Sequence, residues 1–307
     1  MVKKFLLTVG SILVFLLAAG GGYAWWMWHS AAATAQKMYD VKGGKGNHQT
    51  VAVQKPISIL LLGVDERKND SGRSDTIIAL TLNPKTGTMQ MISIPRDTRT
   101  DIVGRGTLDK INAAYAFGGV QMAEDTVSNF VGNIPFDFYI KINMQGMSDL
   151  VDAIGGVTVN NTVDWIDEGY YKKGYHFKTG KITLTDGAMA MGYVRMRHLD
   201  PQGDLGRNKR QREVIMAIVN KMANVSSVSR YSQILQAIGN NVKTNMTFDD
   251  MKNIALHYRN ASKHTINYEV NTTPEKINGV DYLVVSDAEK QRVHDMIEKQ
   301  LGNTTNE

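Results

Sequence analysis

The distribution of apolar and polar residues predicts a domain in which strands and helices follow one another closely. Unbroken apolar runs at Ile57–Gly63, Thr76–Leu82 and Met89–Ile94 are typical of buried strands, and residues 83–87 have the composition of a hairpin turn. Further strands are expected at 138–142, 157–163 and 282–285. Helical spacing predicts helices at 110–117, 120–131, 145–153, 185–191, 208–222, 231–238, 248–258 and 288–301. We therefore expect an α/β fold with a central mixed β-sheet flanked by helices.

The N-terminus has a different pattern, in which Lys3 and Lys4 precede an uncharged apolar run. The run covers about 24 residues, 5–28, which is long enough for a helix to cross a bilayer. A secretory signal peptide begins in the same way, but its apolar core is shorter, about 7 to 15 residues. We expect a cytoplasmic tip at 1–4, a transmembrane signal-anchor helix at 5–28, an extracytoplasmic stalk at 29–55 and a single extracytoplasmic domain at 56–307.

Composition narrows the chemistry of that domain. The 307 residues include no cysteine, which excludes thiol catalysis and zinc–thiolate sites. The net charge of +5 favours a location or a substrate that is anionic, such as lipid head groups or acidic polymers. Because the two N-terminal lysines are expected to stay in the cytoplasm, the domain lies outside it, and this location disfavours nucleic acid as a partner.

Residues 195–212 contain five arginines and one lysine, a density that predicts an anion site. Arg195 and Arg197 fall in a strand-compatible run, 193–197, and would project from the same side, whereas Arg207 and Gln211 are four residues apart on the helix that follows. Glycines at 203 and 206 flank Asp204 and Leu205, so that the backbone can approach a ligand just before this helix begins. Phosphate is the natural ligand; a solvated basic face is the alternative.

Two carboxylates suggest a metal site. Asp65 follows the first predicted strand and Asp75 precedes the second, so both can line one crevice and hold a hard cation such as Mg²⁺. Surface salt bridges with Arg67 and Arg73 explain the same residues equally well. Arg96 and Asp97 follow a strand that stops at Pro95, which places their charges on the rim of the sheet.

These residues form ordered blocks that together resemble the LytR-CpsA-Psr family. The match runs over about residues 57–222, and its blocks are Gly63-Val64-Asp65-Glu66-Arg67, Arg73-Ser74-Asp75-Thr76, Ser93-Ile94-Pro95-Arg96-Asp97-Thr98, Lys110-Ile111-Asn112-Ala113-Ala114-Tyr115 with Gly118-Gly119, Leu150-Val151-Asp152 with Gly155-Gly156-Val157, and Gly203-Asp204-Leu205-Gly206-Arg207 with Arg210-Gln211. Leu205 departs from the phenylalanine that is frequent in the family. The resemblance implies an enzyme of the Gram-positive cell membrane that moves an anionic glycopolymer from an undecaprenyl-pyrophosphate carrier to peptidoglycan. A phosphodiester would join the polymer to peptidoglycan, and the chain looks most like the members that transfer wall teichoic acid.

The resemblance also implies roles for individual residues. Asp65 and Asp75 would hold Mg²⁺, with Mn²⁺ as the other candidate. The groups that would bind the pyrophosphate are Arg73, Arg96, Lys110, Arg195, Arg197, Arg207 and Gln211. The residues nearest the chemistry would be Arg73, Arg96, Asp97 and Asp204. Either aspartate could act as a general base, and the alternative is a metal-assisted attack that needs no base. The helices around 113–117 and 122–131 could wall a channel for the lipid tail, although ordinary core packing is the favoured interpretation of each residue.

Two other functions fit the same sequence. A hydrolase would use the same pyrophosphate site with water as the acceptor, and a receptor for lipid-linked wall precursors would need the arginines but not the aspartate pair. The attacking group leaves no motif of its own, so the sequence does not separate a transferase from a hydrolase, nor does it identify the polymer.

Overall fold

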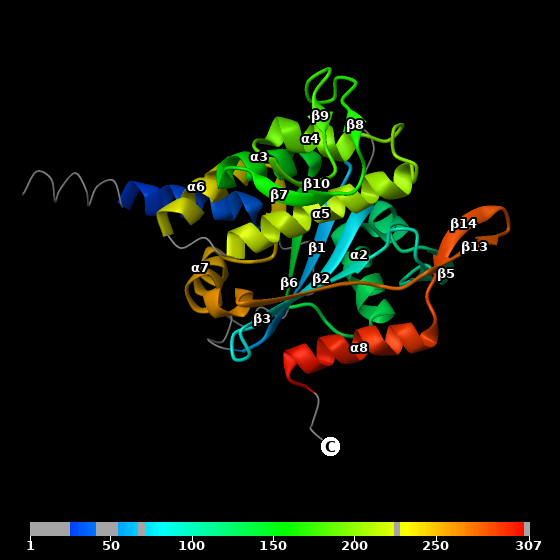
Figure 1. The fold of residues 1–307 in the computed structure, drawn as a ribbon. Coiled ribbons are helices and arrows are strands. Elements are labelled where there is room, and N and C mark those ends of the chain that lie inside the picture. The colour runs from blue at the N-terminus through cyan, green and yellow to red at the C-terminus, as the bar shows by residue number, and fades with distance from the viewer. Residues whose placement is uncertain (1–24, 41–54, 67–71, 224–227, 304–307) are drawn as a thin grey trace, which may run out of the picture.

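A six-stranded mixed sheet organises the computed structural model, which describes residues 25–40, 55–66, 72–223 and 228–303 (Figure 1). Its order is β11 (Val242–Thr244), β6 (Phe138–Asn143), β1 (Ile57–Val64), β2 (Ser74–Asn83), β3 (Thr88–Ile94) and β12 (His264–Glu269). The β1–β2, β2–β3 and β6–β11 pairs are antiparallel, whereas β1–β6 and β3–β12 are parallel. The predicted mixed sheet is therefore confirmed, and its two outer strands come from the C-terminal third of the chain.

Helices cover both faces of this sheet, which explains why its central strands are apolar almost without interruption. Leu60 and Leu62 of β1 face α2 (Ala113–Phe130) and α8 (Asp287–Leu301). Ile59 and Leu61 belong to the opposite core. That second core is covered by α3 (Met144–Ile154), α4 (Gly187–Arg195), α5 (Asp204–Ala223) and α6 (Val228–Ile238), and α7 (Phe248–His257) packs at its margin.

Smaller elements surround the three layers. They are the pairs β4 (Arg99–Ile102) with β5 (Thr107–Lys110), β7 (Val157–Asn161) with β10 (Gly180–Leu184), β8 (Trp165–Ile166) with β9 (His176–Phe177), and β13 (Thr273–Ile277) with β14 (Val280–Val284), and the 3₁₀ turn η2 (Arg259–Ser262). The β4–β5 hairpin carries Lys110, which the sequence placed in a helix, so that prediction was wrong. The helix begins three residues later and is interrupted at Gly118 and Gly119, whose backbone angles are not helical.

The predicted strand at 193–197 was also wrong. Asp186 accepts a hydrogen bond from the backbone N–H of Met189 and so starts α4, which continues through Arg195. The next helix, α5, begins at Asp204 rather than Asn208. Arg195 therefore ends a helix and Arg197 lies in the following loop, and the two side chains do not share one face of a strand.

The predicted stalk, 29–55, was wrong for its first part, because residues 25–38 are helical and lie against the domain (Figure 1). Ala31, Ala35 and Met38 are spaced along one side of this helix and are almost fully buried. The backbone N–H of Asp40 then donates to the carbonyl of Thr244 in β11 at 2.9 Å. The sequence gave little sign of this buried face, because alanine is only weakly hydrophobic. Its small side chain nevertheless lets the helix pack closely against the domain.

Most of the predicted anchor, 5–28, lies outside the described residues, as does the part of the stalk at 41–54. Within the described ranges, no helix combines the length and the apolar character that a membrane span requires. The topology of the N-terminus therefore stays a prediction.

Candidate functional site

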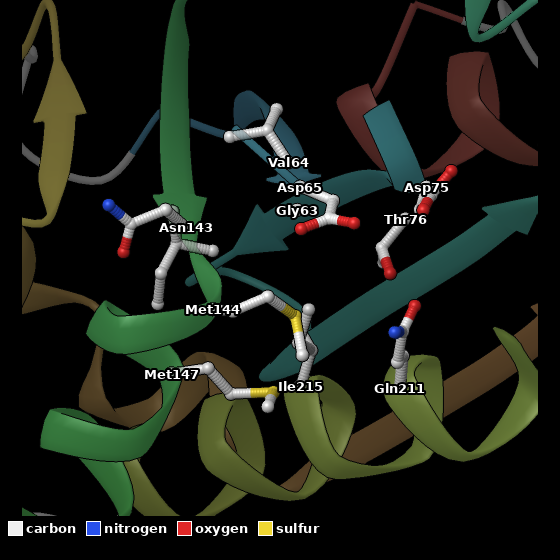
Figure 2. Close-up of a pocket in the computed structure, with 11 residues that line it drawn as sticks. Gly63, Val64, Asp65, Asp75, Thr76, Asn143, Met144, Met147, Gln211 and Ile215 are labelled. Atoms are coloured by element: carbon white, nitrogen blue, oxygen red, sulfur yellow. The ribbon is translucent and has the colours of Figure 1, made fainter. Parts of the chain in front are cut away.

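A small pocket lies beside the register shift between β1 and β2, and we call it the polar pocket after its carboxylate, hydroxyl and amide side chains. Asp65, Asp75, Thr76 and Gln211 line it, the first at the end of β1, the next two on β2 and the last on α5 (Figure 2). The register between the strands shifts between Gly63 and Val64, which ends regular pairing at this point. A side chain at position 63 would come within 2.9 Å of the Thr76 Cβ, so glycine allows the strands to approach here.

Arg96 joins this pocket to the start of α5. Its Nη1 contacts Asp75 Oδ1 at 2.7 Å, its Nη2 pairs with Asp204, and its Nε lies 3.6 Å from Asp97 Oδ2. Burial opposes the charged form of Arg96, but the neighbouring carboxylates, Asp75 first, outweigh it and raise the pKa of this guanidinium. Arg96 is therefore a permanently charged group that is held in one orientation by three partners.

Asp204 gathers further arginines at the first turn of α5. Arg207 Nη2 lies 2.8 Å from Asp204 Oδ1, and Arg197 Nε lies 3.7 Å from the same oxygen. The buried Nε atoms of Arg96 and Arg207 have no hydrogen-bond acceptor among the described residues. The amino end of a helix also favours anions through its backbone dipoles. These arginines can therefore donate further hydrogen bonds to the phosphate oxygens of a ligand.

Lys110 completes the cluster from the β4–β5 hairpin, where its Nζ lies 2.7 Å from Asp97 Oδ1. The ion pairs thus join four cations to three carboxylates, an excess of one positive charge within this network: Arg96, Lys110, Arg197 and Arg207 against Asp75, Asp97 and Asp204. We call these seven residues the arginine–aspartate cluster. Its carboxylates fix the cations in place without neutralising them completely.

Two predicted anion ligands stay apart from this cluster. Arg73 is exposed immediately before β2, and Arg195 is exposed at the last residue of α4. Neither forms an ion pair with the residues that the structure describes. Both still lie next in sequence to elements of the site, and their assignment as pyrophosphate ligands stays a prediction.

Arg210, which belongs to the same basic stretch, has a structural role instead. It is buried, pairs with the buried Asp200, and donates from Nε to the carbonyl of Tyr193 at 3.0 Å and from Nη2 to the carbonyl of Met196. These contacts tie α5 to the end of α4 and to the loop that carries Arg197. The charge density that suggested an anion site in the sequence therefore includes an internal ion pair.

Gly203 and Gly206, the two glycines near Asp204, have different structural roles. Gly203 has φ of +53°, a left-handed backbone conformation that suits glycine at the start of α5. A Cβ at Gly206 would overlap the carboxylate of Asp200. The prediction that both glycines open the backbone to a ligand was therefore wrong for Gly206, which makes room for the buried ion pair.

A second polar cluster lies on the α2 side of the same strand end. Lys141 Nζ donates to Glu66 Oε1 at 2.8 Å and to the Tyr115 hydroxyl at 3.2 Å, and that hydroxyl in turn donates to Glu66. Burial and the contact with Glu66 raise the pKa of Tyr115. These side chains fix the segment that leads out of β1, on the opposite side of the sheet from Gln211.

The donor set of the polar pocket fits one hard divalent cation. The pocket of about 10 Å³ has room for roughly one water-sized group. The described residues contain no cluster of three or more histidine, cysteine or acidic side chains that could form a metal site alone. Mg²⁺ is commonly held by one or two carboxylates together with water and substrate phosphate. Asp65 and Asp75 would suit that mode of binding.

An apolar cavity of about 490 Å³ begins beside the polar pocket. It lies between the sheet and α5, α6 and α7, and the helix at 25–38 also lines it. Ile142 of β6 and Ile215 of α5 line both the pocket and the cavity. The helix segments 113–117 and 122–131, considered as channel walls, instead contribute buried residues to the core on the other face, which confirms core packing for those residues. Phe117 is an exception, because it is exposed.

Comparison with known proteins places this geometry in a family. The model of the LytR_cpsA_psr family matches residues 25–299, which is most of the chain. The chain belongs to the LytR-CpsA-Psr family. It is 47% identical over 283 residues to the polyisoprenyl-teichoic acid–peptidoglycan teichoic acid transferase TagU of Bacillus subtilis, covering 91% of this chain and 90% of the relative. This relative is a transferase by name, in agreement with the enzyme class predicted from the sequence.

Solved structures of the family agree with this placement. The crystal structure of B. subtilis TagU superposes with a TM-score of 0.63 at 42% identity, covering 81% of this chain and all of that one. A structure of TagT bound to LIIa-WTA gives a TM-score of 0.68 at 29% identity, covering 86% and 99% of the two chains. The α/β fold of this LytR-CpsA-Psr chain is therefore that of its relatives.

Sequence reasoning missed several features of the site. It did not anticipate that one carboxylate, Asp204, would collect three arginines, because Arg96 lies 108 residues away along the chain. It also missed the hydrophobic wall that Met144, Met147 and Ile215 provide beside Asp65 and Gln211. The apolar stripe at Ile215 was visible in the sequence, but a stripe of this kind normally signals only core packing.

Proposed function

We propose that this chain is a membrane-anchored phosphotransferase that moves an anionic cell-wall glycopolymer from a polyprenyl-pyrophosphate carrier to peptidoglycan. Teichoic acid is the proposed polymer, because it is the one named for the TagU relative, and we assign it to the wall type because the acceptor named there is peptidoglycan. The N-terminal apolar run would hold the enzyme in the cell membrane with its domain outside.

The observation that carries this proposal is that the polar pocket and the apolar cavity are adjacent and share part of their walls. Ile142 and Ile215 line both, so a molecule whose charged head lies at the arginine–aspartate cluster beside the pocket could extend a long apolar tail into the cavity. Ligand sites in proteins commonly have volumes of about 300 to 1,000 Å³, and the cavity lies within that range. A polyprenyl pyrophosphate has this amphiphilic form.

The arginine–aspartate cluster supports the same ligand. Pyrophosphate oxygens accept hydrogen bonds from guanidinium groups, and Arg96 and Arg207 each keep a buried Nε that has no acceptor among the described residues. The neighbouring carboxylates hold these cations in position before substrate arrives. Positioning and neutralisation of charge are the main requirements of phosphoryl transfer.

In the proposed reaction, a peptidoglycan hydroxyl oxygen attacks the phosphorus that bears the glycopolymer. The new bond joins that oxygen to phosphorus, and the bond from this phosphorus to the bridging oxygen breaks, so that polyprenyl phosphate leaves with the bridging oxygen. The hydroxyl proton passes to a carboxylate, for which Asp97 and Asp204 are the candidates. Arg96, Arg207 and Lys110 neutralise the charge that develops on the phosphate oxygens. A divalent cation at Asp65 and Asp75 would supply further neutralisation.

A transfer assay tests this function. The full chain in detergent is incubated with a lipid-pyrophosphate-linked glycan and peptidoglycan oligomers, with and without Mg²⁺. Comparison of Arg96→Ala and Asp75→Ala with Arg212→Ala is informative, because Arg212 lies on the same α5 but pairs with Glu269 outside the cluster. Loss of one preorganised charge donor typically lowers the rate by about 10²- to 10³-fold.

The products distinguish the candidate functions. Glycan on peptidoglycan, lost in the first two variants and retained in Arg212→Ala, supports the transferase. Free phosphorylated glycan without an acceptor adduct would establish the hydrolase instead. Tight binding of the donor with no turnover would leave a receptor.

A further inference from the structure

Exposed apolar side chains lie at the edge of the cavity and next to it along the chain. Trp25, Trp26 and Trp28, at the start of the 25–38 helix, are 67%, 55% and 46% exposed, and Leu256 at the end of α7 is 51% exposed. Trp28 and Leu256 also line the apolar cavity. The cavity lining is therefore continuous with an apolar outer surface.

Direct contacts connect the two helices that form this edge of the cavity. The rings of Trp28 and Phe248 meet edge to face, with their centroids 5.1 Å apart. Lys252 Nζ lies 5.4 Å from the centre of the Trp28 ring. Phe248 and Lys252 are also residues of the cavity wall. We call Trp25, Trp26, Trp28, Phe248, Lys252 and Leu256 the rim surface.

The position of the rim surface along the chain indicates its partner. Residues 5–24 immediately precede it and contain no charged side chain. Tryptophan is enriched where a protein meets the boundary between lipid and water, because its ring is apolar and its N–H is polar. Helices that lie in this boundary carry aromatic and aliphatic residues on the face toward the lipid.

We propose that the rim surface lies in the lipid–water boundary of the bilayer, so that the cavity opens directly toward the lipid. Membrane contact then includes α7, which is more than 200 residues beyond the N-terminal anchor along the chain. The role that we give to this membrane contact, which is to let a polyprenyl tail enter the cavity laterally from the bilayer, rests on the proposed function. Moving such a tail through water would cost about 0.8 kcal/mol for each exposed CH₂ group, and direct entry avoids that exposure.

The absence of cysteine from the chain makes spin labelling the direct test. Leu256→Cys is labelled with a nitroxide in the full chain, reconstituted in vesicles of phosphatidylglycerol and phosphatidylcholine. Val280→Cys is the matched control, because it is also an exposed aliphatic position, 43% exposed, on the β13–β14 hairpin at the other end of the molecule (Figure 1). Collision rates with oxygen and with a water-soluble nickel chelate are measured at each label.

A label at Leu256 in contact with lipid collides several-fold more often with oxygen than with the chelate, and the label at Val280 shows the reverse ratio. Lys252→Cys provides a second position on α7 and is expected to resemble Leu256→Cys. Equal, water-like ratios at positions 252, 256 and 280 would overturn the proposal. These ratios report membrane contact whether or not glycan is transferred, so failure of the transfer assay alone would refute only the proposed function.

Discussion

Removal of the charge on Arg210 tests whether this arginine of the basic stretch 195–212 stabilises the fold rather than binds an anion. The Arg210 and Asp200 side chains are 5% and 2% exposed, and each is the ion-pair partner of the other. We expect Arg210→Met to leave the Asp200 carboxylate buried without its counter-charge. Breaking a buried pair in this way costs about 3 to 5 kcal/mol.

This cost translates into a large shift in thermal unfolding. For a domain of this size, each kcal/mol lowers Tm by about 2 to 4 °C, so the expected decrease is about 6 to 20 °C. The measurement is circular dichroism of the full chain in detergent during heating. Arg212→Met is the matched control, because the partner of Arg212, Glu269, is 51% exposed and such a pair contributes about 0 to 1 kcal/mol.

Replacement of both partners provides a second comparison. The double variant Arg210→Met with Asp200→Leu removes both buried charges, and we expect it to recover much of the lost stability. If Arg210→Met lowered Tm no more than Arg212→Met, the assignment of Arg210 as an internal structural residue would be wrong. Arg210 would then be a candidate anion ligand, like the other arginines of the basic stretch.

Three other substitutions test particular contacts. Gly206→Ala should lower Tm, because its Cβ would overlap the Asp200 carboxylate, and thermal unfolding measures this effect. Thr247→Ala should cost about 1 kcal/mol in urea unfolding, because it removes the capping box that Thr247 forms with Asp250; an unchanged midpoint would argue against that cap. Burial raises the pKa of Glu213, so its ionised form destabilises the fold above that raised pKa. Glu213→Gln should therefore raise Tm at pH 8, and the gain should vanish below pH 4.5, the ordinary carboxyl value.

The sheet could be predicted well where the sequence was unambiguous. The long apolar runs that became β1, β2 and β3 have no helical alternative once their turn residues are considered, and the register of β2 with β3 follows from the hairpin. The edge strand β12 carries exposed residues on most of its length and gave no such signal. It joins the sheet through a parallel pairing with β3 that no local pattern encodes.

The site was predictable as a set of residue types but not as a geometry. Arg96, Asp204 and Lys110 were all identified, yet the ion pairs of Arg96 with Asp204 and of Lys110 with Asp97 depend on tertiary packing. Arg210 illustrates the opposite case, because a buried and an exposed arginine look the same in a sequence. The apolar cavity was out of reach for a similar reason, since its walls have the same periodicity as an ordinary core.

The most direct measurement of the central claim compares the binding of three soluble ligands to the full chain in nanodiscs. Inorganic pyrophosphate, geranyl pyrophosphate and farnesyl pyrophosphate share one head group and differ in the length of the apolar tail. If the polar pocket and the cavity form one site, Kd falls from the first ligand to the third. Ile218→Glu, which places a carboxylate in the cavity wall, should remove that trend, whereas Arg96→Ala should weaken the binding of all three ligands. Equal affinities for the three ligands in the unmodified chain would contradict the account.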